Sequence, residues 1–266
     1  MLVDAHAHLD QIDDLETVLT WAKEAGIGKI ITVGSSIKSS KKAIEIATKY
    51  STSGLQIYAT CGIHPADGKD DTKRPDYIEQ LKSACQSSDK VVGIGECGLD
   101  VRVTSVQLPE TRDQERKFQK KLFVEQVKLA GELDLPLVIH CRNAWGEILD
   151  LVSGFRFQVS GVFHSFTGDW QAAKKALDLG FYISFSGIMT FKNASEIANV
   201  AKKMPIDKML IETDSPYLSP DPMRGKKNEP KNVKIIAAVI ANLRGQSVNE
   251  IESKTAENTR KLFKLL

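Results

Sequence analysis

The chain has 266 residues, of which 42% are hydrophobic and 26% charged, a composition typical of a globular protein with a sizeable core rather than a disordered chain. Its 36 basic residues offset 34 acidic ones, and the net charge of +2 excludes general binding of polyanions through a global field. Four cysteines without CxxC spacing exclude a disulfide framework, and no apolar run reaches the roughly 18 residues that span a membrane. We expect one domain over residues 1–266, monomeric, cytoplasmic and without membrane contact.

The first half of the chain alternates short apolar runs with segments of helical spacing. Leu2, Val3 and Leu9 indicate an opening strand, and a helix over 15–25 follows, which Gly26 is placed to end. The alternation continues with predicted strands at 29–33, 55–61 and 91–96 and helices at about 40–50, 77–85 and 111–133.

The second half repeats this pattern, with predicted strands at 135–140, 160–164, 181–185 and 208–214 and helices at about 145–152, 170–179, 196–204, 232–243 and 249–262. Eight short apolar strands, each followed by a helix, indicate a parallel sheet that is covered on its outer side. Eight such units close into a barrel. We therefore predict an α/β protein, a single-domain (β/α)8 TIM barrel with an extra C-terminal helix.

His6 and His8 lie two residues apart at the end of the opening strand, so their side chains point to the same face. Two imidazoles on one face can bind a single divalent metal ion through neutral ring nitrogens. Taken alone, such a pair is more often two polar residues where a strand leaves the core. The rest of the chain has to decide between these readings.

All five histidines lie at or just past the C-terminal end of a predicted strand: His6, His8, His64, His140 and His164. Glu96 and Asp214 occupy the equivalent place on two other strands. In a parallel barrel these strand ends surround one mouth, where active sites of this fold are built, so we predict that all seven groups converge. The set suits Zn, Mn, Fe or Mg. Because seven groups exceed the needs of one ion, we predict two divalent ions with Glu96 as the bridge.

Seven stretches of the chain resemble, in order and register, motifs of the TatD family of metal-dependent deoxyribonucleases, which are amidohydrolase-type TIM barrels. These stretches are DAHAHL (4–9), GIHP (62–65), GIGECGLD (93–100), LVIHCR (137–142), HSFTG (164–168), LIETDSPYLS (210–219) and RGKKNEP (224–230). The resemblance implies a phosphodiesterase, often a 3′ to 5′ exonuclease on single-stranded DNA.

The resemblance also implies the division of labour within the site. One metal would be held by His6, His8, Glu96 and Asp214, and the second by Glu96, His140 and His164. His64 would sit near the scissile phosphate and help with proton transfer or charge; in a two-metal mechanism it could protonate the leaving alkoxide. A water between two metals loses a proton near neutral pH and attacks phosphorus in line, and Asp214 can orient that water or accept its proton.

The segment over 216–234 carries five positive charges and follows the eighth strand, where phosphate sites of this fold often form. Arg224 is the main candidate for substrate binding because its planar fork can grip a phosphate at two points. Arg142, two residues beyond His140, is a second candidate. The lysines of the segment are as readily explained by a solvated loop.

Several nearby residues are left open between support and packing. Asp4 and Asp100 could each hold the tautomer of a metal-binding histidine. Phe166, Phe191 and Tyr217 could stack a splayed base, although aromatic side chains near strand ends more often pack at the rim.

Two other functions remain possible at this stage. A metal-activated water attacks carbonyl carbon as readily as phosphorus, so an amidase or lactonase-type hydrolase is the alternative within enzymes. A non-catalytic, metal-dependent nucleic-acid binder is the alternative outside them. The complete set of seven groups argues against the binder, and the basic segment around Arg224 favours a phosphodiester.

Overall fold

The computed structural model describes residues 1–101, 109–155 and 159–265, and of residues 109–112 only the backbone. Its strands are β1 (Leu2–Ala7), β2 (Ile27–Val33), β3 (Gln56–Cys61), β4 (Val91–Asp100), β5 (Leu137–Arg142), β6 (Gly161–Phe163), β7 (Tyr182–Phe185) and β8 (Met209–Ile211). Its helices are α1 (Leu15–Glu24), α2 (Ile37–Tyr50), α3 (Tyr77–Gln86), α4 (Pro109–Leu133), α5 (Trp145–Ser153), α6 (Trp170–Asp178), α7 (Ser195–Lys203), α8 (Val233–Arg244) and α9 (Val248–Leu262).

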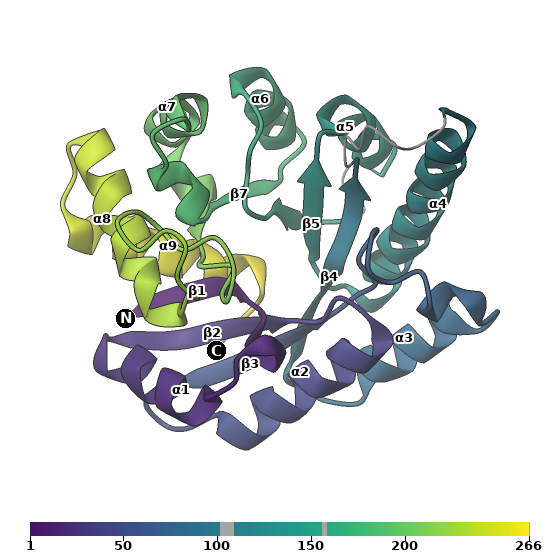
Figure 1. Ribbon diagram of the computed structural model, residues 1–266, viewed down its shortest axis with the longest axis horizontal. Coiled ribbons are helices and arrows are strands. Elements are labelled where there is room, and N and C mark those ends of the chain that lie inside the picture. Colours follow the sequence, from purple (N-terminus) through teal and green to yellow (C-terminus); the bar gives the residue numbers. More distant parts are fainter. Residues whose placement is uncertain (102–108, 156–158, 266) are drawn as a thin grey trace.

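The eight strands form one parallel sheet in the order β1 to β8, surrounded by helices (Figure 1). The segment after β8 returns to β1 and closes the barrel. The backbone N–H of Asp214 donates to the carbonyl of His6 at 2.9 Å, and that of His8 donates to the carbonyl of Ser215 at 2.7 Å. The predicted (β/α)8 barrel with an extra C-terminal helix, α9, is confirmed.

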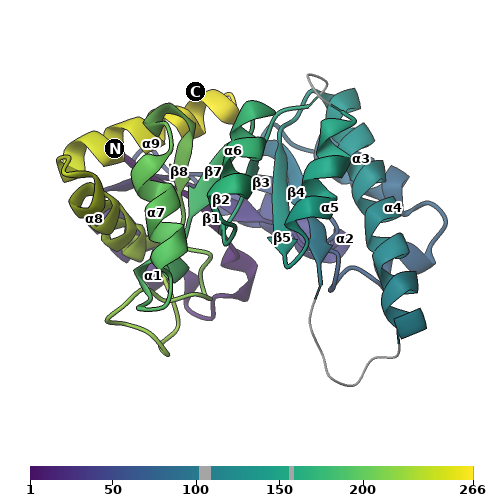
Figure 2. The ribbon, with the colours of Figure 1, turned by 90° about the horizontal axis from the view of Figure 1, so that it is seen from above.

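A small apolar layer fills the interior of the barrel, apart from the larger core between strands and helices. Each strand contributes one residue to this layer: Ala5, Ile31, Tyr58, Val92, Val138, Val162, Tyr182 and Leu210. Leu262 and Phe263, at the end of α9, pack against the layer. In Figure 2, α9 lies at the upper end of the barrel, away from the loop that follows β8 at the lower edge. The interior is therefore closed at the α9 end.

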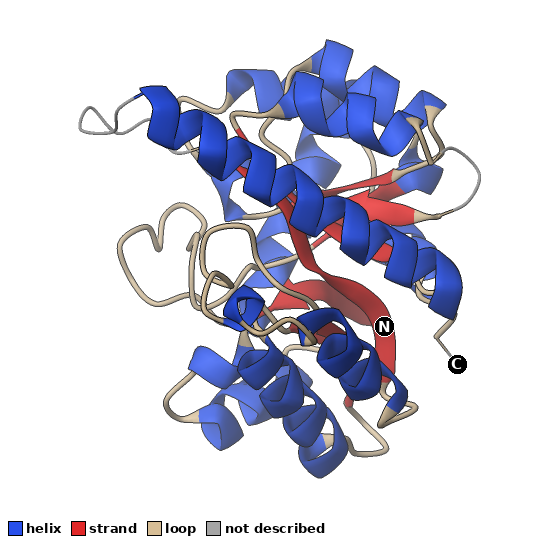
Figure 3. Cartoon of the chain, turned by 90° about the vertical axis from the view of Figure 1, so that its right-hand side faces the viewer, coloured by secondary structure: helices blue, strands red, loops and turns tan. Residues whose placement is uncertain are grey.

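Helix boundaries follow local capping chemistry. Four helices begin after a side chain that accepts a hydrogen bond from a backbone N–H of the first turn, as N-caps do; these residues are Asp14, Ser36, Asp169 and Ser247. Helix α8 ends at Gly245, whose φ of 64° is left-handed. The longest helix, α4, crosses the outer face in front of the strands in Figure 3. None of the helices in the described ranges is both long and apolar enough to cross a membrane.

The largest departure from the predicted elements is strand β4, which continues four residues beyond the expected end at Glu96. Its extension pairs with β5, with Cys97 opposite Ile139 and Asp100 opposite Arg142. Gly98 makes this pairing possible, because a Cβ there would come within 2.0 Å of the His140 carbonyl oxygen. Two strands thus run side by side to the barrel mouth.

Candidate metal centre

The C-terminal strand ends open into a cleft of about 720 Å³. Six of the seven groups predicted to converge line this cleft, namely His8, His64, Glu96, His140, His164 and Asp214. The seventh, His6, is fully buried and contacts Glu96 and Asp214. The structure therefore brings all seven groups together, as expected from their places at strand ends.

Interior strand residues explain how several of these side chains are aimed. Side chains two residues apart on a strand share a face. On β5 the interior residue Val138 precedes His140 by two positions, and on β6 Val162 precedes His164 in the same way. The apolar layer thus fills the barrel below a polar layer at its mouth.

His6 and His8 face the same two carboxylates at the centre of the site. His6 Nε2 and His8 Nε2 are 3.3 Å apart. His6 Nε2 lies 3.7 Å from Glu96 Oε2 and 3.5 Å from Asp214 Oδ1, and His8 Nε2 lies 3.5 and 3.4 Å from the same two oxygens. Ligands about 2.1 Å from a tetrahedral ion lie about 3.4 Å apart, close to these five distances. His6, His8 and Glu96 are close enough to hold one cation, and Asp214 is close enough to both histidines to join them.

A second set of atoms gathers on the other oxygen of the same carboxylate. Glu96 Oε1 lies 2.8 Å from His140 Nδ1 and 2.9 Å from His164 Nε2, and these two nitrogens are 3.2 Å apart. His64 Nε2 lies further away, 3.6 Å from Oε1. Glu96 therefore turns one oxygen to each of two groups of possible ligands.

Glycines allow Glu96 to reach this position. A Cβ on Gly62 would come within 2.4 to 2.7 Å of backbone atoms of Gly95 and Glu96. The Glu96 N–H donates to the Gly34 carbonyl at 2.8 Å. The glycines of the GIHP and GIGECGLD stretches thus let β3 and β4 approach closely beside the carboxylate.

Asp214 is held by backbone contacts at the barrel seam. Its φ of 58° lies in the left-handed region, which Asp tolerates better than most residues. Next to it, Thr213 donates to the Asp4 carboxylate from its N–H at 2.8 Å and from its hydroxyl at 2.6 Å. Asp4 therefore anchors the segment after β8 and does not hold a histidine ring.

Burial and neighbouring charges set the protonation of the centre. Burial would raise the pKa of Glu96, but the surrounding imidazoles, His164 foremost, hold it well below its usual range. Burial would lower the pKa of His8, but the Asp214 and Glu96 carboxylates raise it to about 9. Burial and the neighbouring His164 lower the pKa of His6 well below its usual value. Glu96 thus carries negative charge and His6 is a neutral imidazole, as a divalent cation requires of its ligands, whereas His8 would release its proton when an ion binds.

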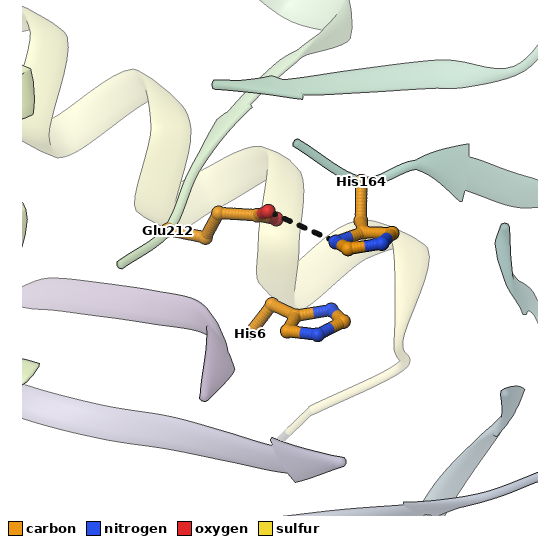
Figure 4. A group of neighbouring side chains, drawn as sticks. All are labelled: His6, His164 and Glu212. Atoms are coloured by element: carbon orange, nitrogen blue, oxygen red, sulfur yellow. Dashed lines mark hydrogen bonds and ion pairs between the residues drawn. The ribbon is translucent and has the colours of Figure 1, made fainter. Parts of the chain in front are cut away.

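Glu212 is a site residue that the sequence analysis missed. Its side chain is 1% exposed, accepts the Ser165 N–H at 2.7 Å and lies 3.2 Å from His164 Nδ1 (Figure 4). A signal was present, because Glu212 stands midway between the interior residue Leu210 and Asp214, two positions from each. From the sequence, Glu212 is predicted only as part of the eighth strand.

The two candidate arginines lie in different surroundings. Arg142 lines the cleft, and its Nη1 lies 3.5 Å from Asp100 Oδ2. The same oxygen lies 3.5 Å from His140 Nε2, so Asp100 contacts a histidine ring as proposed from the sequence. Arg224 is exposed and its guanidinium stacks over the Phe191 ring, 4.4 Å from the centroid, outside the residues that line the cleft.

The three aromatic candidates also separate. Phe166 is fully buried between Trp145 and Phe185 and belongs to the core. Phe191 lies under Arg224. Tyr217 lines the cleft with half of its surface exposed, beside the His8 ring. Of the three, Tyr217 is the one with an open face at the cleft.

A (β/α)8 barrel whose mouth gathers histidines and carboxylates in this way defines a metal-dependent hydrolase. The family model described as "TatD related DNase" matches residues 3–264, and the chain belongs to that family. Its resemblance to TatD enzymes, seen first in seven short stretches, therefore extends over nearly the whole chain.

Relatives and solved structures agree with this assignment. The chain is 38% identical to the "uncharacterized metal-dependent hydrolase YabD" of Bacillus subtilis, over 100% of both chains. It superposes on YjjV, a TatD homolog from Escherichia coli K12, with a TM-score of 0.88 and 30% identity, covering 100% of this chain and 98% of that one. A TatD family hydrolase from Entamoeba histolytica gives a TM-score of 0.85 at 26% identity, with the same coverage.

Proposed function

We propose that this protein hydrolyses phosphodiester bonds of DNA, acting as a 3′ to 5′ exonuclease on single strands with two divalent ions. The observation that carries the proposal is the Glu96 carboxylate, which faces His6 and His8 with one oxygen and His140 and His164 with the other. A carboxylate shared between two ligand sets is typical of two-metal hydrolases. The match to a family described as DNases supports DNA as the substrate.

In this proposal each set of neighbouring atoms binds one ion. His6, His8, Glu96 and Asp214 bind the first, and Glu96, His140 and His164 bind the second. When bound, such ions acidify a water and neutralise charge on the phosphate. Zn, Mn, Fe and Mg all suit the donor set, although imidazole-rich sites favour transition metals.

Residues at the cleft would handle the protons and the phosphate. Asp214 would orient the attacking water or accept its proton. His64 Nδ1 accepts the Ala66 N–H at 3.2 Å, which leaves the hydrogen of the neutral ring on Nε2, on the side of Glu96, so His64 would donate a proton to the leaving oxygen from Nε2. Arg142, on the cleft wall, would bind a phosphate, and Arg224 would contact the strand further out.

The test is the shortening of a single-stranded oligonucleotide labelled at its 5′ end, with Mg, Mn, Zn or Fe added to metal-stripped protein. We expect a ladder of products shortened from the 3′ end by the wild type and none by Glu96→Ala. Glu257→Ala, on the exposed face of α9, is the matched control and should keep full activity. Internal fragments would contradict exonuclease action, and an intact oligonucleotide with every metal would contradict the nuclease itself.

We further propose that the protein is a monomer of the cytoplasm. All four cysteines are buried and free, which agrees with a reducing compartment. Light scattering on the purified protein checks the mass against the 29.4 kDa of one chain.

A further inference from the structure

Glu212 contacts the metal centre from behind its histidines. Its Oε1 accepts the backbone N–H of Ser165 at 2.7 Å, and the same oxygen lies 3.2 Å from His164 Nδ1. In Figure 4 the carboxylate points at His164, while the His6 ring lies parallel to the His164 ring, with centroids 4.1 Å apart. Two donors therefore converge on one buried oxygen.

This geometry decides which nitrogen of His164 carries hydrogen. Both ring nitrogens face carboxylate oxygens, Nδ1 that of Glu212 at 3.2 Å and Nε2 that of Glu96 at 2.9 Å, but only Nε2 lies among the second set of ligands. A ring that binds an ion through Nε2 keeps its one hydrogen on Nδ1, where the Glu212 oxygen accepts it. In a neutral imidazole the lone pair then belongs to the other nitrogen, Nε2. Nε2 is the atom that faces Glu96 Oε1 at 2.9 Å, where the second set of ligands gathers.

We propose that Glu212 is a positioning residue for the second metal: it holds the hydrogen of His164 on Nδ1 and so presents the Nε2 lone pair to the ion. The inference rests on the two-metal function proposed above. A carboxylate behind a metal-binding histidine fixes the tautomer and raises the basicity of the ring.

Glu212 supports His164 alone among the proposed ligands of the described residues. His140 presents Nδ1 to Glu96 at 2.8 Å, and its Nε2 lies 3.5 Å from Asp100 without a hydrogen bond. The Nδ1 atoms of His6 and His8 are also buried and have no hydrogen-bond partner in the part of the chain that the structure describes. Loss of Glu212 should therefore weaken the second metal site and leave the first unchanged.

Glu212 could alternatively be a ligand itself, since its oxygen lies close enough to His6 and His164 for the three to share a cation. Its contacts argue against this. The oxygen nearest His164 already accepts two hydrogens, and a metal there would have to displace the Ser165 N–H. The number of ions bound separates the two roles.

The experiment measures zinc binding and histidine NMR on the full chain. Metal-stripped wild type should bind two zinc equivalents by calorimetry. Glu212→Ala should bind one of the two about 10- to 100-fold less tightly, as for other supporting residues, with the other unchanged. In the zinc-loaded wild type, a slowly exchanging Nδ1–H signal that is absent from His164→Asn should disappear in Glu212→Ala.

Two variants keep the result interpretable. Glu212→Gln retains an oxygen that can accept both hydrogens, so we expect it to keep the Nδ1–H signal and lose less zinc affinity than Glu212→Ala. Equal losses in the two variants would overturn the acceptor role. Glu257→Ala, with an exposed glutamate removed, should bind zinc as the wild type does.

The remaining outcomes also decide. Two unchanged affinities and an intact Nδ1–H signal in Glu212→Ala overturn the inference while the two-metal proposal stands. A wild type that binds three equivalents, of which Glu212→Ala loses one, makes Glu212 a ligand and overturns the positioning role. A wild type that binds one equivalent overturns the two-metal proposal and, with it, the inference.

Discussion

At the scale of residues, Asp100 joins the metal centre to the cleft wall. Its Oδ2 lies 3.5 Å from a nitrogen of His140 and 3.5 Å from a nitrogen of Arg142. The Asp100 side chain is buried, whereas Arg142 is half-exposed and can turn towards a ligand in the cleft. A phosphate bound by Arg142 would thus be separated from His140, a proposed metal ligand, only by the Asp100 carboxylate.

Substitution of Arg142 should separate phosphodiester from carbonyl substrates. We expect Arg142→Ala to raise KM for an oligonucleotide about 10- to 100-fold, because a hydrogen bond to a charged group contributes about 1.5–3 kcal/mol. Arg224→Ala should raise it less, since this exposed guanidinium lies outside the cleft lining. Steady-state kinetics on the oligonucleotide and on a small neutral ester provide the comparison.

Arg260→Ala, on the exposed face of α9, serves as the charge-matched control and should leave the kinetics on both substrates unaffected. A loss in Arg142→Ala that is equal for the ester and the oligonucleotide would argue against phosphate binding and revive the amidase or lactonase alternative.

At the scale of elements, helix α9 closes the end of the barrel opposite its mouth. Leu262 and Phe263 pack against the apolar layer in the barrel interior, at the end opposite the loop that follows β8. In this layer, Val138 and Val162 precede His140 and His164 by two positions along the chain. The extra helix therefore packs against the apolar layer that supports the metal centre.

Removal of the Phe263 ring should destabilise the barrel without emptying its site. We expect Phe263→Ala to lower the free energy of unfolding by about 3–5 kcal/mol, the usual cost of deleting a buried aromatic ring. Its exposed neighbour Lys264, paired with Asp134, is the control, and Lys264→Ala should cost under about 1 kcal/mol. Urea denaturation of both proteins, with metal content measured beforehand, checks this. Equal free energies of unfolding for Phe263→Ala and Lys264→Ala would show that the barrel interior does not depend on packing by α9.

Most of the strands and the convergence of the seven groups could be predicted, because short apolar runs and chemically distinctive histidines mark each strand end. The length of β4 could not, since it depends on the tight approach of Gly98 to the His140 carbonyl, a contact between different strands. The role of Glu212 could not be predicted, because a single carboxylate after an apolar run does not indicate that His164 lies beside it. The contact of Arg224 with Phe191 depends on how two loops meet.

At the scale of the whole molecule, binding of metal should stabilise the fold, because the ligands come from strands around the entire barrel. A ligand at 100 times its Kd adds about 2.7 kcal/mol to folding. For a chain of this size we expect Tm to rise by about 5–10 °C. Calorimetry of metal-stripped protein titrated with Zn or Mn tests this, and Glu96→Ala, which lacks the shared carboxylate, should show little change. An equal rise in Glu96→Ala would place the stabilising ion elsewhere.

The seam of the barrel links the site to the order of synthesis. Asp4 binds Thr213 across 209 residues of chain, and the backbone of His6 bonds that of Asp214 beside it. Contacts of such sequence separation form late, since the intervening chain must first be ordered. A nascent or truncated chain that ends before β8 holds His6 and His8 but lacks the carboxylate opposite them. The first metal site is therefore complete only when β8 and the segment after it have joined β1.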